Sequence, residues 1–279
     1  MNIGAILFLL FSLFLGSFQT PVSEPVHVID TESMEGVFGF TNADGTSIIV
    51  HGLGVGQEAA MSKWNKAIGE SGKVLSVKYA TYQKGNIDKS SGRDTSYNFE
   101  NMAGYIFNVK EGSSTPNETY FLINENDFDL KALLPIKKTE DALKNDSLIA
   151  KEISAKKQRP ITNIWQIAQF SDSQKLFLVK FKRQGDDMLF SLVLQREDKL
   201  LFNDFPAKTK DEISVWRVDD GGEVTPDMFS LLFAAKTSDG LALSIEWWGS
   251  EGENTFVIAD DGEQFHELPI SYYRYTYPT

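Results

Sequence analysis

The sequence predicts an α+β protein in which antiparallel β-meanders predominate and two or three helices complete the fold. Long stretches alternate apolar and polar residues and are broken by Gly, Asn and Asp turns, whereas few segments have helical spacing. Such alternation is typical of antiparallel sheets. A third observation, an internal duplication in the C-terminal half, sets the predicted architecture.

The duplicated segments are residues 160–206 and 226–269. Each opens on a proline, runs through an apolar stretch to a Ser-Asp turn, and continues with two apolar strands before closing on Pro. The central strand of each copy carries an apolar row, which is Phe177, Val179 and Phe181 in the first and Leu243, Ile245 and Trp247 in the second, 66 positions later. A slip of one residue would turn every side chain to the opposite face. The matching parity therefore predicts two equivalent meanders that pack as a pseudo-symmetric pair.

The chain divides into three parts. Residues 1–19 form a leader, 20–137 an N-terminal α+β lobe, and 138–279 a C-terminal lobe that contains the duplicated meanders. Segment 104–135 resembles the duplicated unit distantly, so either a degenerate third copy or an unrelated meander accounts for it.

In the N-terminal lobe, an Asn-Ala-Asp-Gly turn predicts a hairpin between VFGF and SIIV. Helical spacing predicts a helix over 57–68, and alternation predicts a strand over 73–82.

In the C-terminal lobe, acids at the start and bases at the end of 139–159 predict a helix whose charges match its dipole. EISVWRV (212–218) and the aromatic tail (270–277) read as strands.

The leader is an uncharged apolar run from Ile3 to Phe18. Its length of ~16 residues is short of the ~20 that a membrane span needs, which favours a cleaved export signal over an uncleaved anchor or a buried segment. The chain has no Cys, which excludes disulfides, thiolate metal sites and a lipoprotein anchor. We therefore expect a secreted or periplasmic protein, with outward-facing anchoring by this segment as the alternative.

The net charge of -12 and the pI near 4.8 exclude nucleic acid and anionic membrane surfaces as partners. The partner we expect is an extracytoplasmic ligand or protein of unknown identity, and the membrane is contacted only through the leader. The three His residues have no metal-ligand spacing and no catalytic motif is present, so we expect no metal and no cofactor.

The strongest candidate binding site is aromatic. Trp247 shares the apolar face of its strand, so that Trp248 and Glu246 fall on the opposite face, while Tyr273 and Tyr275 alternate with Arg274 in the last strand. Flat rings beside a carboxylate and a guanidinium could stack against a sugar or a protein partner. The alternative is that these rings pack in the core.

A weaker candidate is an anion site at Gly54 and Gly56, which fit G-x-G-x-x-A between a predicted strand and helix. The next strand lacks the acid that would hold a ribose, so a tight strand–helix connection is the alternative.

These observations favour an exported or membrane-tethered binding protein without catalytic activity, whose ligand is a polymer, a small molecule or a protein. One alternative is a secreted or periplasmic hydrolase, which would need a pocket with a carboxylate of raised pKa. Another is an envelope assembly or structural factor that recognises its partner at an unguarded sheet edge.

Overall fold

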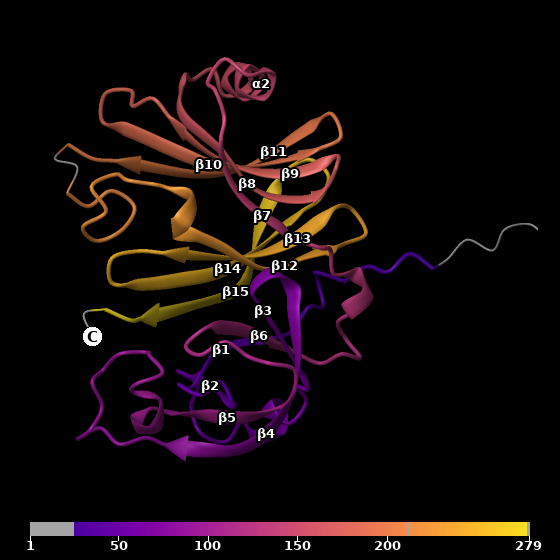
Figure 1. The fold of residues 1–279 in the computed structure, drawn as a ribbon, viewed down its shortest axis with the longest axis vertical. Helices are drawn as coiled ribbons and strands as arrows, with labels where there is room; N and C mark the ends of the chain where they lie inside the picture. The colour runs from indigo at the N-terminus through magenta and orange to yellow at the C-terminus, as the bar shows by residue number, and fades with distance from the viewer. Residues whose placement is uncertain (1–24, 211–212, 278–279) are drawn as a thin grey trace, which may run out of the picture.

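A computed structural model describes residues 25–210 and 213–277, so the predicted leader at 1–19 lies outside the described residues. Figure 1 shows four layers stacked along the long axis: a helix, a five-stranded sheet, a four-stranded sheet and a β-barrel. The strand pairs are almost all antiparallel, which confirms the predicted α+β class dominated by antiparallel sheet.

The barrel is closed in the order β1-β2-β5-β4-β3-β6. Its strands are β1 (Val37–Thr41), β2 (Ser47–His51), β3 (Lys66–Gly69), β4 (Lys73–Lys84), β5 (Ala103–Glu111) and β6 (Thr119–Ile123).

The remaining strands form two sheets. The five-stranded sheet has the order β11-β10-β9-β8-β7 and contains β7 (Lys137–Ala142), β8 (Ile161–Ser171), β9 (Gln174–Phe181), β10 (Asp187–Arg196) and β11 (Lys199–Lys208). The four-stranded sheet has the order β12-β13-β14-β15 and contains β12 (Phe229–Lys236), β13 (Leu241–Trp248), β14 (Gly252–Asp260) and β15 (Phe265–Tyr275).

Helices are short. The α-helices of the described residues are α1 (Glu58–Met61) and α2 (Leu148–Lys157), and the 3-10 turns are η1 (Glu70–Gly72), η2 (Phe99–Asn101), η3 (Leu130–Ala132) and η4 (Pro226–Met228).

Apolar cores fill the space between successive layers. One lies between the two sheets and includes Leu178, Phe190 and Ile245, and a second lies between the four-stranded sheet and the barrel and includes Phe121 and Phe233. Further cores occupy the barrel interior and the space beneath α2. The four-stranded sheet is therefore buried on both faces.

The predicted hairpin and the strand over 73–82 are confirmed as β1–β2 and β4. The helix predicted over 57–68 is wrong, because α1 ends at Met61 and β3 follows. Met61, Trp64 and Ala67 still share one core, but they reach the barrel interior from a helical turn followed by a strand. Pairing of β3 with β4 and β6 closes the barrel, and this outweighs the local helical spacing.

The helix predicted over 139–159 is shorter than expected. Its first part joins the sheet as β7, which pairs with β8. Helix α2 starts after Ser147, whose side chain accepts a hydrogen bond from the amide of Ala150, and it ends at Gln158 in the left-handed region. The start of α2 is therefore set by the cap at Ser147 and not by the acidic residues at 140–141.

Two other predicted elements differ. Residues 213–218 of the predicted strand EISVWRV form bends and turns instead of a strand, because Asp220 binds their amides, as described below. In segment 104–135, β5 pairs with β2 and β4 while β6 pairs with β1 and β3. These two strands belong to the barrel and do not pair with each other as the strands of a meander would.

The two duplicated segments fold as four-stranded antiparallel meanders, β8–β11 and β12–β15, with the same strand order. The apolar rows are not equivalent, however: Phe177 faces the core under α2, whereas Leu243 faces the core between the sheets. Leu176 and Leu178 are the residues of β9 that share the inter-sheet core with Leu243. The matching parity therefore does not place the two rows in one core, and the duplication itself stays a prediction.

Candidate functional site

Three adjoining hollows lie where β13 turns into β14, between the four-stranded sheet, the barrel and residues 213–228. We call them the outer hollow (about 310 Å³), the middle hollow (about 290 Å³) and the acidic hollow (about 220 Å³). The outer and middle hollows share Arg217 and Trp247, and the middle and acidic hollows share Trp248 and Asp227. Because neighbouring hollows share lining residues, we refer to the three together as the groove.

Asp220 organises the loop that makes one wall of the groove. Its carboxylate accepts hydrogen bonds from the amides of Val215, Trp216, Arg217 and Gly222, at 2.7–3.1 Å. A short acidic side chain that binds nearby amides offers the backbone an alternative to a strand. The loop is therefore held in one conformation that presents Trp216 and Arg217 to the groove.

Arg217 lines both the outer and the middle hollow. Its guanidinium lies 4.5 Å from the centroid of the Trp247 ring and donates to the carbonyl of Gly252 at 3.1 Å. Gly249 permits this placement, because a Cβ there would lie 2.5 Å from Arg217 Nη1. The arginine is thus a fixed positive charge in the middle of the groove.

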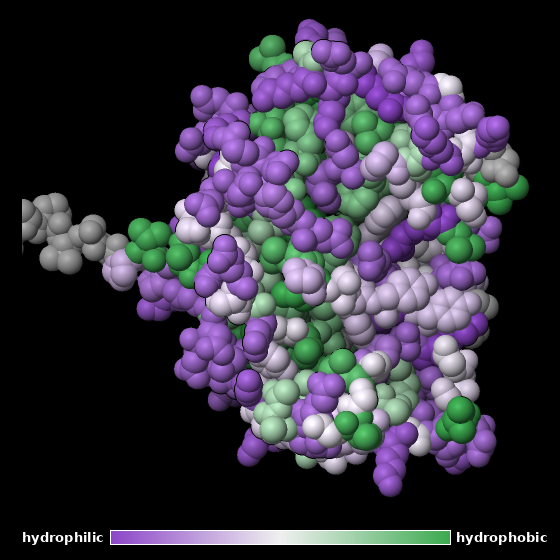
Figure 2. All heavy atoms as spheres, turned by 180° about the vertical axis from the view of Figure 1, so that it is seen from behind, coloured by the Kyte–Doolittle hydropathy of each residue, from purple (hydrophilic) through white to green (hydrophobic). Residues whose placement is uncertain are grey.

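Aromatic rings form much of the groove's surface. Tyr273 is 54% exposed and lines the outer hollow with Trp216, while Trp248 is half-buried and lines the other two hollows. Figure 2 shows a mostly hydrophilic surface with a band of pale side chains of intermediate hydropathy, the class of Trp and Tyr, at the level of the four-stranded sheet in Figure 1. Flat rings with polar neighbours suit stacking against a ring-shaped ligand.

The acidic hollow contains a buried carboxyl group. Glu246 is 7% exposed, and its Oε2 accepts from Ser230 Oγ at 2.8 Å and from Trp248 Nε1 at 3.0 Å. Within the described residues its Oε1 has no hydrogen-bond partner. Burial, and next the charge of Glu253, raise the pKa of Glu246 to about 8.

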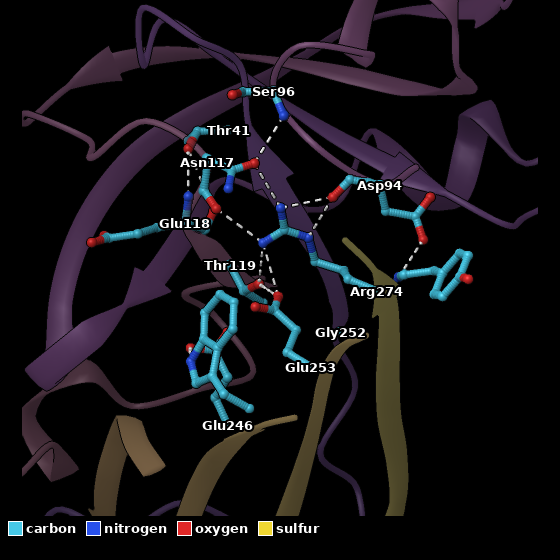
Figure 3. Close-up of polar contacts among 12 residues, drawn as sticks. Thr41, Asp94, Ser96, Asn117, Glu118, Thr119, Glu246, Gly252, Glu253 and Arg274 are labelled. Atoms are coloured by element: carbon cyan, nitrogen blue, oxygen red, sulfur yellow. Dashed lines mark hydrogen bonds and ion pairs between the residues drawn. The ribbon is translucent and has the colours of Figure 1, made fainter. Parts of the chain in front are cut away.

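Arg274 lies behind the groove and is fully buried. It donates to Glu253 Oε1 at 2.8 Å, to the carbonyl of Asp94 at 2.9 and 3.1 Å, and to the carbonyl and side-chain oxygens of Asn117, both at 2.9 Å. Glu253 also accepts from Thr119 Oγ1 at 2.5 Å. Figure 3 shows these groups converging on the guanidinium from the barrel and from the sheet.

The predicted binding residues therefore separate into two groups. Trp248, Glu246 and Tyr273 line the groove, whereas Arg274 is a buried link between the sheet and the barrel. Tyr275 is half-buried beside Arg93, whose guanidinium lies 4.2 Å from its ring centroid, and it lines none of the three hollows.

Gly54 and Gly56 lie in an exposed loop that Tyr105 anchors, accepting from the amide of Gln57 and donating to the carbonyl of Gly54. The helix that follows, α1, has four residues with Glu58 at its start. Because a helix this short has a weak dipole and the acid adds negative charge, the loop offers little attraction to an anion.

Sequence reasoning missed the loop residues Trp216, Arg217 and Asp220, because it interpreted EISVWRV as a strand. The Asp-Asp-Gly-Gly sequence that follows is a turn signal, and Asp is a frequent organiser of such turns. That signal could have marked the preceding residues as a loop.

No family model matches this chain, and neither the curated proteins nor the solved structures contain a significant match. In the described part of the chain, no group of three or more His, Asp and Glu side chains is arranged to hold a metal ion. Over the same residues, no helix has the length and apolar character needed to cross a membrane.

Proposed function

We propose that this chain is an exported or membrane-tethered binding protein without a catalytic role, and that it binds a carbohydrate in the groove. The observation that carries the proposal is the set of rings along the groove, Trp216, Trp248 and Tyr273, with Arg217 and several carboxylates between them. Sugar rings have apolar faces that stack on aromatic rings and hydroxyl groups that bind charged side chains.

The free sheet edges favour a carbohydrate over an extended peptide. A peptide commonly binds by adding a strand to an open edge. Here β7 carries Lys137 and Lys138, β11 carries Pro206 and β15 carries Pro269, and all of these residues discourage strand addition. The C-terminal end of β12 is paired through the bridges Leu133–Ala235 and Ile29–Thr237. These features also argue against an assembly factor that works by strand addition.

Glycan binding to the mature protein tests the proposal. The wild type and Tyr273→Ala are compared on an immobilised panel of neutral, acidic and basic oligosaccharides. Because Tyr273 is exposed in the outer hollow, its truncation should weaken capture about tenfold and leave the melting temperature nearly unchanged. Tyr277→Ala is the matched control, since Tyr277 is 59% exposed and lines none of the three hollows. Equal capture by the wild type, Tyr273→Ala and Trp248→Ala would rule out the groove.

A hydrolase is the second candidate, and one observation favours it. Glu246, with a pKa of about 8, could act as a general acid, and Glu118 and Asp227 line the same hollow. New reducing ends released from a bound oligosaccharide by the wild type, and not by Glu246→Gln, would establish catalysis. We expect no release.

A further inference from the structure

The acidic hollow has a strong excess of negative charge. Its wall carries four carboxyl groups, contributed by Glu70, Glu118, Asp227 and Glu246, and one cationic side chain, Lys138. Lys138 Nζ lies 3.4 Å from Glu70 Oε1 in a pair exposed to solvent. The other carboxyl groups outnumber the positive charge at the wall, so the hollow attracts a cation.

A buried oxygen without a hydrogen-bond partner lies beside these carboxyl groups. The Glu246 side chain is nine-tenths buried at the wall of the hollow, and its Oε1 has no hydrogen-bond partner in residues 25–210 and 213–277. When Glu246 is ionised, this oxygen is a buried acceptor without a donor, which is unfavourable. A ligand that brings N–H donors into this hollow would supply the missing donor.

The wall also has a flat side. Trp248 lies in the acidic and middle hollows, and its indole nitrogen donates to Glu246 Oε2 at 3.0 Å. This hydrogen bond fixes the ring beside the carboxyl group. A ligand that occupies both hollows would place a ring against Trp248 and a cationic substituent against Glu246.

We propose that the acidic hollow binds the primary ammonium group of an amino sugar, with Glu246 as the buried acceptor and Trp248 as the wall against which the sugar ring stacks. The inference rests on the carbohydrate function proposed above and specifies the class of sugar. An ammonium group has three donors and no acceptor, so it suits a pocket of carboxylates. A metal ion suits it less, since the described carboxyl groups are not arranged as metal ligands.

Binding should be linked to proton release. Near neutral pH, Glu246 holds a proton because burial and Glu253 raise its pKa to about 8. An ammonium group beside it favours the carboxylate, so the O–H bond of Glu246 breaks and its proton passes to the solvent. The charged groups facing Glu246 from the surrounding elements are Glu253, Arg274, Asp227, Glu70, Glu118 and Lys138.

Isothermal titration calorimetry at pH 6 tests the inference, with a β-1,4-linked glucosamine trimer and its N-acetylated counterpart as matched ligands. Two buffers of different ionisation enthalpy report the protons released. We expect the glucosamine trimer to bind at least tenfold more tightly and to release about one proton. Affinity should rise about tenfold from pH 5.5 to 6.5, because less energy is then needed to ionise Glu246.

Two variants separate the acidic hollow from the rest of the groove. Glu246→Gln keeps the shape of the neutral side chain and should abolish both the preference for the amino sugar and the proton release. Lys138→Gln removes a competing cation and should tighten binding of the glucosamine trimer about threefold. Glu152→Gln is the control, because Glu152 is exposed on α2, lines none of the three hollows and should leave the preference unchanged.

The outcomes that contradict the inference differ from those that contradict the proposed function. Equal affinity for the two trimers, or unchanged proton release in Glu246→Gln, would overturn the ammonium site while groove binding stands. Binding of other glycans without either trimer would do the same. Absence of binding for every oligosaccharide would overturn the carbohydrate function as well.

Discussion

At the scale of single residues, alternation along a strand predicted correctly which side chains share a face of the sheet. It did not predict which layer of the protein covers each face. Trp247 is in the core as predicted, and Tyr273 is exposed on the face opposite Arg274. Arg274, which was also predicted to contact a ligand, is fully buried because the barrel covers that face of the sheet. Exposure depends on the neighbouring layer, which the local sequence does not encode.

Arg274→Met should destabilise the fold by about 3–5 kcal/mol, because it leaves Glu253 buried without its cation. Urea unfolding of the purified variant measures the loss. The double variant Arg274→Met/Glu253→Met is the control and should recover much of it, since no charge is then left unpaired. A single variant as stable as the wild type would show that the ion pair contributes little.

Trp248→Ala should weaken ligand binding about tenfold and reduce stability by about 1–2 kcal/mol. The ring is half-buried and its indole N–H satisfies Glu246 Oε2, so truncation also removes a buried hydrogen bond. Glycan titration and thermal unfolding of the same sample measure both effects. Trp248→Ala that unfolds at the expression temperature would mark this ring as core.

At the scale of elements, the sequence predicts strands well and helices poorly. Strand alternation and turn residues located the β1–β2 hairpin and both meanders, because these depend on local spacing and turn chemistry. The helix predicted over 57–68 failed because its apolar residues face the interior of a barrel that strands distant in sequence close. The groove was not predicted for the same reason, because a loop and the barrel, which lie outside the sequence of β13, form its walls around that strand.

A strand that is apolar on both faces indicates that a layer of the protein covers each face of its sheet. In β12, Leu231 and Ala234 face the inter-sheet core, and Leu232, Phe233 and Ala235 face the barrel. A continuous apolar run of this kind indicates a strand buried on both sides. This apolar run, which contrasts with the alternating strands, would have predicted that the four-stranded sheet is a middle layer.

Asp220→Asn should loosen the loop and weaken ligand binding about tenfold, while the sheets keep their stability. The carboxylate accepts four backbone N–H bonds, which an amide oxygen accepts less strongly. Hydrogen exchange of the amides of 215–217 measures the loosening. Asp198→Asn, in an exposed turn, is the control. Unchanged exchange in Asp220→Asn would show that other contacts hold the loop.

At the scale of the whole molecule, the barrel and the four-stranded sheet are joined through polar groups as well as an apolar core. Glu253 and Arg274 from the sheet bind Thr119 and Asn117 from the barrel side, and Glu246 lies on the same face of the sheet. Protonation of Glu246 therefore affects the contact between two layers.

Stability should fall as the pH rises from about 5 to about 8. The pKa of Glu246 is raised from 4.5 to about 8, so over this interval the folded chain holds a proton that the unfolded chain has lost. The slope contributed by this group is at most about 1.4 kcal/mol per pH unit, and it disappears above pH 8. Urea unfolding at pH 5.5, 7 and 8.5 measures it, and Glu246→Gln should lack this contribution. An identical slope in the variant would contradict the assignment.

The most direct test of the central claim, that the groove holds a carbohydrate, is a tryptophan fluorescence titration of the purified protein with the panel of neutral, acidic and basic oligosaccharides. Three of the five tryptophans, Trp216, Trp247 and Trp248, line the groove. We predict a saturable change in emission that Tyr273→Ala weakens and Tyr277→Ala leaves intact. An emission spectrum that no oligosaccharide alters, or a change of equal affinity in Tyr273→Ala, would contradict the account.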